Sequence, residues 1–405
     1  MQSVAESWLV YRLTGSAALL GAASFVSQAP VFFLATIGGT VADRRKRHHI
    51  IIATQTISMI LPLILGTLTL TAHVRVWHVF VLAGCLGVVN AFDVPARQAF
   101  LIEMVGRDDL INAIALNSSI VNAARFAGPA VAGILVATIG EGWCFLLNGL
   151  SYIAVIAGLL MMNVPARPAA TRKRDALIET TEGFRFVLQT RPVRALLLLV
   201  GIVSLAGLPY SVLMPLFADS VLHAGPRVLG MLIAASGFGA LCGALSLATR
   251  TGVRGLGRWV ALSAGTFGIA LILFALSRTV WLSALLLIPA GGAMIVQMAS
   301  TNTLIQSMVP DALRGRVTAV YSMMFMGMAP FGALFAGWLA GRVGAPETVI
   351  FGGVVCVGSA IVFAIRLPTL RVVARQLIVA QELAGGDPPA EVTDQGAGVP
   401  LDASG

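Results

Sequence analysis

Four ionisable residues lie within or beside long apolar stretches of the sequence: Glu6, Asp93, Arg97 and Arg125. An ionisable side chain in hydrocarbon is costly unless it is paired or hydrated, so each of the four is a candidate for chemistry. Asp93 and Arg97 are four residues apart and can pair on one face of a helix, and Arg125 follows in the next apolar stretch. Two hypotheses fit this spacing: a gating or proton-responsive cluster, or a static ion pair that fixes helix packing.

Glu6 has a different setting, because it stands next to Trp8 in a short apolar segment at the start of the chain. A carboxyl group in apolar surroundings is suited to binding and releasing a proton during a transport cycle. The alternatives are a solvated acid that faces outward, and a segment too short to be stable.

The elements that carry these residues must be membrane helices. The chain has 405 residues, of which 57% are apolar and 11% are charged, whereas a soluble domain carries about 25% charged residues. A helix needs about 20 mostly apolar residues to cross the bilayer. Ten uncharged runs of 17 to 32 residues meet this need: 13–42, 48–74, 76–92, 142–166, 195–218, 228–249, 259–277, 279–310, 317–341 and 348–365. A soluble enzyme, a nucleic-acid-binding domain and a secreted disulfide scaffold are therefore excluded.

Two further segments complete the predicted fold. Residues 110–138 form an eleventh span that only Arg125 interrupts, whereas Met1–Tyr11 covers about 16 Å of helix and cannot cross. We interpret Met1–Tyr11 as the outer half of a truncated first helix. The predicted fold class is an all-α polytopic membrane protein with eleven full transmembrane helices plus this stub.

Basic residues set the expected orientation. Of 27 Lys and Arg residues, 20 fall on one side of the predicted helices, including the cluster 44–47. Lys and Arg are retained in the cytoplasm during insertion. The sequence therefore predicts a multi-pass protein of the cell (inner) membrane, with both ends of the complete chain cytoplasmic.

The longest loop divides the spans six and six. The predicted domains are an N-terminal bundle at 1–162, a cytoplasmic linker with an amphipathic helix at 163–192, a C-terminal bundle at 193–366, and a cytoplasmic tail at 367–405 whose end is disordered. An offset of 204 residues aligns the two halves without gaps and matches Gly128 and Gly133 with Gly332 and Gly337. At the same offset Asp93 and Arg97 correspond to Gln297 and Thr301. Repeated helix bundles are common in secondary transporters.

The loop at 39–47 resembles the cytoplasmic signature of the major facilitator superfamily, on the strength of Gly39, Asp43, Arg44 and Arg47. Val41 and Lys46 depart from the usual pattern. The resemblance implies two six-helix bundles and a latch that holds one conformation. The alternative is a plain basic loop on the cytoplasmic side.

The fifth predicted helix carries Gly128, Pro129 and Gly133, which are similar to the exporter motif of this superfamily, with Ala132 where a glycine is usual. A generic small-residue helix contact is the alternative. Segments 1–16, 92–98 and 209–218 resemble the enterobactin-exporter-like branch. This resemblance implies proton-driven efflux of an amphipathic small molecule, either a siderophore or a drug.

The same interpretation assigns the remaining roles. Glu6 or Asp93 carries the proton, Arg125 senses it, and a monomer moves its small-molecule substrate across the lipid bilayer. Neither a cofactor nor a metal is expected, and nucleic acid is not a partner. An importer of the same fold and a non-transporting or defective membrane protein remain as alternatives. The expected cavity lining is mostly uncharged and comprises Asn117, Asn122, Gln297, Asn302, Tyr321 and Met323.

Overall fold

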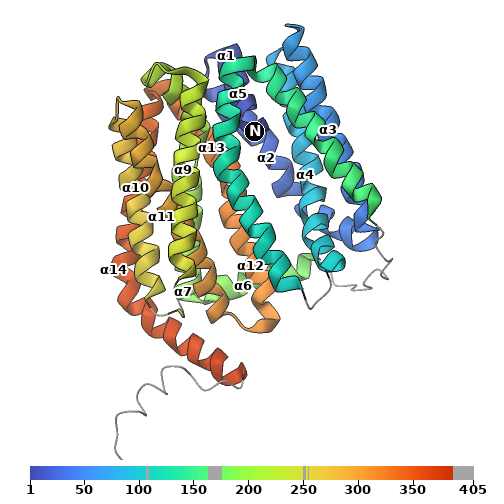
Figure 1. Ribbon diagram of the computed structural model, residues 1–405. Coiled ribbons are helices and arrows are strands. Elements are labelled where there is room, and N and C mark those ends of the chain that lie inside the picture. Colours follow the sequence, from blue (N-terminus) through green and yellow to red (C-terminus); the bar gives the residue numbers. More distant parts are fainter. Residues whose placement is uncertain (106–108, 163–175, 250–251, 254, 386–405) are drawn as a thin grey trace, which may run out of the picture.

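The computed structural model describes residues 1–105, 109–162, 176–249, 252–253 and 255–385, and some helical residues in these ranges by their backbone alone. Every regular element of this part of the chain is helical (Figure 1). The elements are α1 (Gln2–Thr14), α2 (Ala17–Arg44), α3 (Arg47–Leu70), α4 (Val76–Val105), α5 (Leu110–Met161), α6 (Ala176–Gln189), α7 (Arg191–Ile202), η1 (Val203–Gly207), α8 (Tyr210–Leu216), η2 (Phe217–Val221), α9 (Gly225–Ala248), α10 (Leu256–Leu276), α11 (Val280–Met308), α12 (Asp311–Ser322), η3 (Met323–Gly327), α13 (Met328–Val343) and α14 (Ala345–Gly385).

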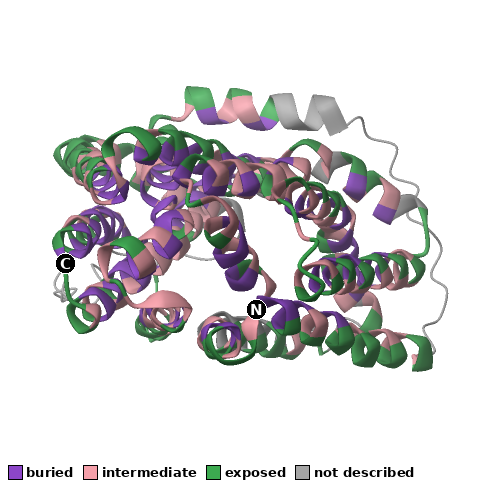
Figure 2. Ribbon diagram, turned by 90° about the horizontal axis from the view of Figure 1, so that it is seen from above, coloured by how far each residue is buried: buried purple, intermediate pink, exposed green. Residues whose placement is uncertain are grey.

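The helices present apolar surface to their surroundings. Among the described residues, ten helical segments are long and apolar enough to cross a bilayer. Their outward faces carry large apolar side chains such as Phe33, Leu262 and Trp281, which are 60%, 64% and 80% exposed. Figure 2 shows buried residues gathered where helices face one another and exposed residues along the periphery. Lipid tails cover such a periphery without the cost that water would impose. The chain is therefore a multi-pass membrane protein, as its uncharged runs predict.

The predicted count of eleven full spans plus a stub is not confirmed. One of the ten segments, residues 127–161, lies in α5, whose 52 residues contain a break at Gly140 with φ 84° and ψ 163°. Glycine adopts this positive φ at little cost, and the chain reverses there at the upper end of Figure 1. α1 has 13 residues, which give about 20 Å of helix, less than the hydrocarbon layer.

The helix ends define two faces of the molecule. We call the lower end in Figure 1 the basic face, because the chain turns there at 44–47, between α4 and α5, between α9 and α10, and after α11. The upper end, where α1 meets α2 and where α5 reverses, is the opposite face. At the opposite face Gly15 ends α1 in the left-handed conformation and the Ser16 hydroxyl caps α2 by accepting from the Leu19 N–H.

Two spans are built from several pieces. The span after the linker runs through α7, η1, α8 and η2, and the span before α14 runs through α12, η3 and α13. The three η segments are π-helical turns, which insert one residue into an α-helix and bend it. Pro215 in α8 adds a missing backbone donor to the first of these spans.

The two halves of the chain meet through two helix pairs, α5 with α9 and α2 with α13. A Cβ atom on Gly133 would lie 2.5 Å from the Cα of Gly230, and one on Gly21 would lie 2.9 Å from the Cα of Gly337. Only glycine allows backbones to approach so closely. All four glycines lie toward the opposite face, and α5 and α9 diverge toward the basic face (Figure 1).

Packing within each half agrees with the predicted 204-residue repeat. A side chain on Gly87 of α4 would collide with the carbonyl oxygen of Ser27 on α2, and one on Gly291 of α11 would collide with the carbonyl oxygen of Ser236 on α9. Gly87 and Gly291 are 204 residues apart. The pairs α2–α4 and α9–α11 therefore make the same contact in the two halves.

The linker and the C-terminal region are both helical where they are described. α6 covers the segment in which an amphipathic helix is predicted, with Val187 buried and Leu188 exposed. α14 continues through Pro368 to Gly385, well past the predicted boundary at 366, because Leu370, Ala374 and Leu377 keep a helical spacing and pack on the core. The predicted disordered end lies outside the described residues.

Candidate functional site

Asp93 is the centre of a buried polar cluster between α3 and α4. Its Oδ1 atom accepts hydrogen bonds from Thr54 Oγ1 at 2.7 Å and Gln55 Nε2 at 2.9 Å. Its Oδ2 atom accepts from Arg97 Nη2 at 2.6 Å and Arg97 Nε at 3.2 Å. Four donors thus occupy a carboxylate that offers about four acceptor positions.

The predicted partners Asp93 and Arg97 differ in their exposure. The Asp93 side chain is 7% exposed and the Arg97 side chain is 58% exposed. The carboxylate is therefore held inside the bundle, while the guanidinium extends from it into accessible space. An exposed cation beside a buried anion gives a path along which a proton or a charged group can reach the cluster.

The sequence pattern did not identify Thr54 and Gln55. Both are buried, at 6% and 4% exposure, in the uncharged run 48–74. Two adjacent polar residues in the middle of an apolar span are the signal that pointed to a buried partner on a neighbouring helix.

Arg47 anchors the predicted latch at the basic face. Arg47 Nη1 pairs with Glu103 Oε1 of α4 at 2.7 Å, and Arg47 Nε donates to the Ala42 carbonyl at 3.2 Å. One guanidinium therefore ties the end of α2, the start of α3 and the end of α4 together. Gly39 is half-buried with open space around its Cα. The side chains of Asp43 and Arg44 lie outside the described residues.

The exporter-like segment of α5 lies at the junction of the two halves. Gly133 makes the close crossing with Gly230 of α9, and the Pro129 carbonyl oxygen would lie 2.8 Å from a Cβ on Gly230. Gly128 is one turn further into the membrane, where a Cβ would lie 4.0 Å from the Met1 nitrogen. The glycines of this motif therefore set how closely the halves approach.

A hydrogen bond also joins the halves near the opposite face. Tyr11 of α1 donates its hydroxyl to Asp219 Oδ2 of η2 at 2.8 Å. Beside it, Arg12 forms an ion pair with Glu141 of α5. These polar contacts and the two glycine crossings lie on the same side of the molecule.

Glu6 is half-buried on α1, between the buried residues Ala5 and Trp8. It makes no hydrogen bond or ion pair with any side chain in the described part of the chain. Gln2 accepts a hydrogen bond from Asn148 of α5 at 3.0 Å, which fixes the start of the helix. Glu6 is thus apart from the Asp93 cluster.

The predicted lining residues have varied settings. Gln297 is 1% exposed, Asn302 accepts a hydrogen bond from Gln306, and Tyr321 donates to the Met298 carbonyl at 3.0 Å. Asn117 and Met323 are exposed. The side chains of Asn122 and Arg125 lie outside the described residues. Among the residues that are described, no three His, Cys, Asp or Glu side chains come close enough to hold a metal ion.

Comparison with known proteins decides the family. The sequence profile of a family described as "Transmembrane secretion effector", within the major facilitator group, matches residues 1–385. The chain belongs to the major facilitator superfamily. It is a transport protein and not an enzyme, and the predicted enterobactin-exporter-like resemblance is confirmed.

Two relatives and one solved structure place it more closely. The chain is 30% identical over 395 residues to the multidrug efflux pump Tap of Mycobacterium tuberculosis, covering 91% of this chain and 89% of Tap. It is 27% identical over 333 residues to the enterobactin exporter EntS of Shigella boydii, covering 82% and 79%. The crystal structure of the nucleoside transporter NupG superposes with a TM-score of 0.68 at 14% identity, over 89% of this chain and 94% of that one, which shows a shared fold.

Proposed function

We propose that this chain is a proton-coupled exporter of an amphipathic small molecule, either a siderophore or a drug. The relatives that support this proposal include a multidrug efflux pump and an enterobactin exporter. The exporter-like glycines of α5 support it as well, because Gly133 lies where the halves meet.

One observation carries the proposal: the halves approach most closely toward the opposite face and diverge toward the basic face (Figure 1). Because basic loops remain in the cytoplasm, we take the basic face as cytoplasmic. This state is then closed to the outside and accessible from within. Export requires that the Gly133–Gly230 and Gly21–Gly337 crossings and the Tyr11–Asp219 hydrogen bond separate while the cytoplasmic ends come together.

Asp93 and Glu6 are the proposed proton carriers. A proton on Asp93 needs one of its four donors to turn away, and the 58% exposed Arg97 has the most freedom to do so. Proton binding would then release Arg97 and change the link between α3 and α4. Glu6 has no such partners and would load its proton directly. Arg125 is proposed to sense this change, and Arg47 with Asp43 and Arg44 to latch the cytoplasmic side.

The substrate would pass between the halves as a monomer carries out the cycle. Asn117 and Met323 are exposed, and we assign them to the lining with Asn122, Asn302 and Tyr321. An uncharged lining with adaptable methionines suits varied apolar molecules. Gln297 would join the lining only in the other conformation.

The test is dye transport in inverted membrane vesicles that contain the protein. We expect an imposed proton gradient to drive a fluorescent amphipathic dye into these vesicles, with Glu6→Gln or Asp93→Asn uncoupling dye movement from the gradient. Glu347→Gln is the matched control, because Glu347 is an exposed acid at the opposite face.

Each other result contradicts part of the proposal. Intact coupling in both variants would show that the carriers are misassigned. Dye accumulation only in right-side-out vesicles would identify an importer, and no transport in either orientation would favour the non-transporting alternative.

A further inference from the structure

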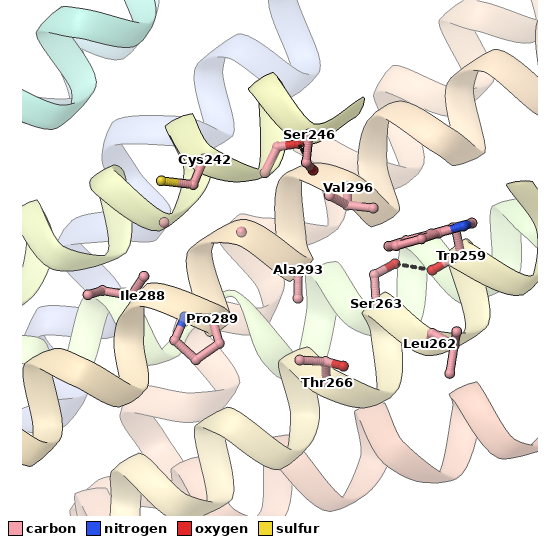
Figure 3. Close-up of a pocket in the computed structure, with 13 residues that line it drawn as sticks. Cys242, Ser246, Trp259, Leu262, Ser263, Thr266, Ile288, Pro289, Ala293 and Val296 are labelled. Atoms are coloured by element: carbon pink, nitrogen blue, oxygen red, sulfur yellow. Dashed lines mark hydrogen bonds between the residues drawn. The ribbon is translucent and has the colours of Figure 1, made fainter. Parts of the chain in front are cut away.

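A groove of about 340 Å³ lies on the C-terminal half, away from the junction of the halves. Three helices form it (Figure 3): α9 contributes Cys242 and Ser246, α10 contributes Trp259, Leu262 and Thr266, and α11 contributes Ala293. These residues recur at spacings of three and four on each helix, so each helix presents one continuous face. The volume is near the lower end of the range of about 300–1,000 Å³ for pockets that bury a drug-sized ligand.

The groove opens sideways toward the lipid. Leu262 on its wall is 64% exposed and Trp259 is 38% exposed, and Cys242 is exposed as well. The junction of the halves is made by Gly230, near the other end of α9. The groove is therefore separate from the proposed transport path and lies in the half of the membrane next to the basic face.

The polar atoms of the wall are already satisfied. Ser263 donates its hydroxyl to the Trp259 carbonyl at 2.6 Å (Figure 3), and Ser246 donates to the Gly243 carbonyl at 2.8 Å. These hydroxyls need no hydrogen bond from an occupant. The wall thus behaves as an apolar surface, which suits an acyl chain.

Positive charge lies at the mouth of the groove. Arg258 is exposed on the first turn of α10, four residues before Leu262 and hence on the same face. α10 begins at Gly255 without a side-chain cap, so its first N–H groups and its dipole also favour an anion. In the sequence Arg250 and Arg254 precede it. Trp259 stands between this charge and the apolar wall, the usual place of tryptophan at a membrane interface.

We propose that this groove binds an anionic phospholipid of the basic-face leaflet, with one acyl chain along α9, α10 and α11 and the phosphate at Arg258 and the start of α10. Apolar walls that run into a cationic mouth match the two parts of such a lipid. The bound chain would brace α11 at Val296, which lines the groove directly before Gln297.

Fluorescence quenching by brominated lipids tests the proposal. The chain has six tryptophans, so we would compare a variant that keeps only Trp259 with one that keeps only Trp281, which is 80% exposed. Both are placed in phosphatidylcholine vesicles that contain the same fraction of brominated phosphatidylglycerol or brominated phosphatidylcholine. We expect at least twofold stronger quenching of Trp259 by the brominated phosphatidylglycerol, and equal quenching of Trp281 by the two lipids.

Two substitutions sharpen the result. Arg258→Gln should abolish the preference for phosphatidylglycerol, whereas Arg278→Gln, at the far end of the same helix, should leave it intact. Ala293→Leu should weaken quenching of Trp259 by filling the groove. If a single-tryptophan variant fails to fold, native mass spectrometry of the otherwise unmodified protein and of Arg258→Gln measures retained phosphatidylglycerol instead.

Several outcomes would overturn the proposal. Equal quenching of Trp259 by both lipids would mean ordinary lipid contact without a site. Absence of quenching would mean that no lipid enters. A preference unaffected by Arg258→Gln would place the headgroup elsewhere, and displacement of the lipid by a transported dye would assign the groove to the substrate.

Discussion

Asp93 on α4 and Gln297 on α11 occupy equivalent positions 204 residues apart, but their surroundings differ. Asp93 is 5% exposed and receives four hydrogen bonds from Thr54, Gln55 and Arg97. Gln297 is 1% exposed, and its Nε2 atom has no hydrogen-bond partner in the described part of the chain. Thr301, the counterpart of Arg97, is likewise buried with an unpartnered hydroxyl. The repeat thus fixes where the helices lie, whereas polar partners from a neighbouring helix decide whether the position holds charge.

The strongest way to break this comparison is Asp93→Ala. The change leaves Thr54, Gln55 and Arg97 without their common acceptor, and breaking a buried ion pair costs about 3–5 kcal/mol. We expect a large fall in the melting temperature of the detergent-purified protein, followed by tryptophan fluorescence. Glu347→Ala is the control, and an Asp93→Ala melting temperature equal to that of the parent would mean that the cluster adds nothing to stability.

A subtler change separates the donors of the two halves. Thr54→Val keeps the shape but removes a donor to a charged acceptor, which is worth about 1.5–3 kcal/mol. Thr301→Val removes a hydroxyl that has no partner, so its free energy of unfolding should not fall. Thermal unfolding of both variants measures the difference, and equal losses would show that the two hydroxyls are equivalent after all.

Where the halves meet, the comparison should instead give equality. Gly133→Ala and Gly337→Ala each insert a methyl group against the backbone of another helix, at a cost of about 1–3 kcal/mol for overpacking. Gly158→Ala, where the structure has open space, should be neutral or slightly stabilising. We expect the first two variants to lose stability alike, and a tolerated Gly133→Ala would show that the crossing is not tight.

The smallest effect is expected at the position that lacks partners. Gln297→Leu replaces an amide that is buried without a full set of hydrogen bonds by an apolar group of similar size. The free energy of unfolding should stay within about 1.5 kcal/mol of the parent value or rise. A clear loss in chemical unfolding would reveal an interaction of Gln297 with water or with a residue outside the described ranges.

Much of the fold follows from charge alone. The uncharged run 279–310 corresponds to α11 at Val280–Met308, and the run 259–277 to α10 at Leu256–Leu276. The run 348–365 predicts where α14 crosses but not its continuation to Gly385, since a helix beyond the bilayer needs only an amphipathic spacing. The break at Gly140 lies between two predicted spans, where the sequence places only Glu141.

The candidate site was harder to predict. Helical spacing is enough to pair Asp93 with Arg97, because both lie on one helix. Thr54, Gln55 and Glu103 are not adjacent to their partners in the sequence, so their roles emerge only when α3 and α4 are packed together. The same is true of Asp219, whose partner Tyr11 is 208 positions away.

By itself the sequence determined the solvent and the elements, since the absence of charge over lengths that match a bilayer leaves only membrane helices as a solution. It also determined the repeat, because equivalent glycines recur at one offset. The tertiary structure alone decided which polar groups are satisfied, which glycines touch across the halves, and where a groove opens toward lipid. Those properties depend on distances between helices, which a linear pattern does not contain.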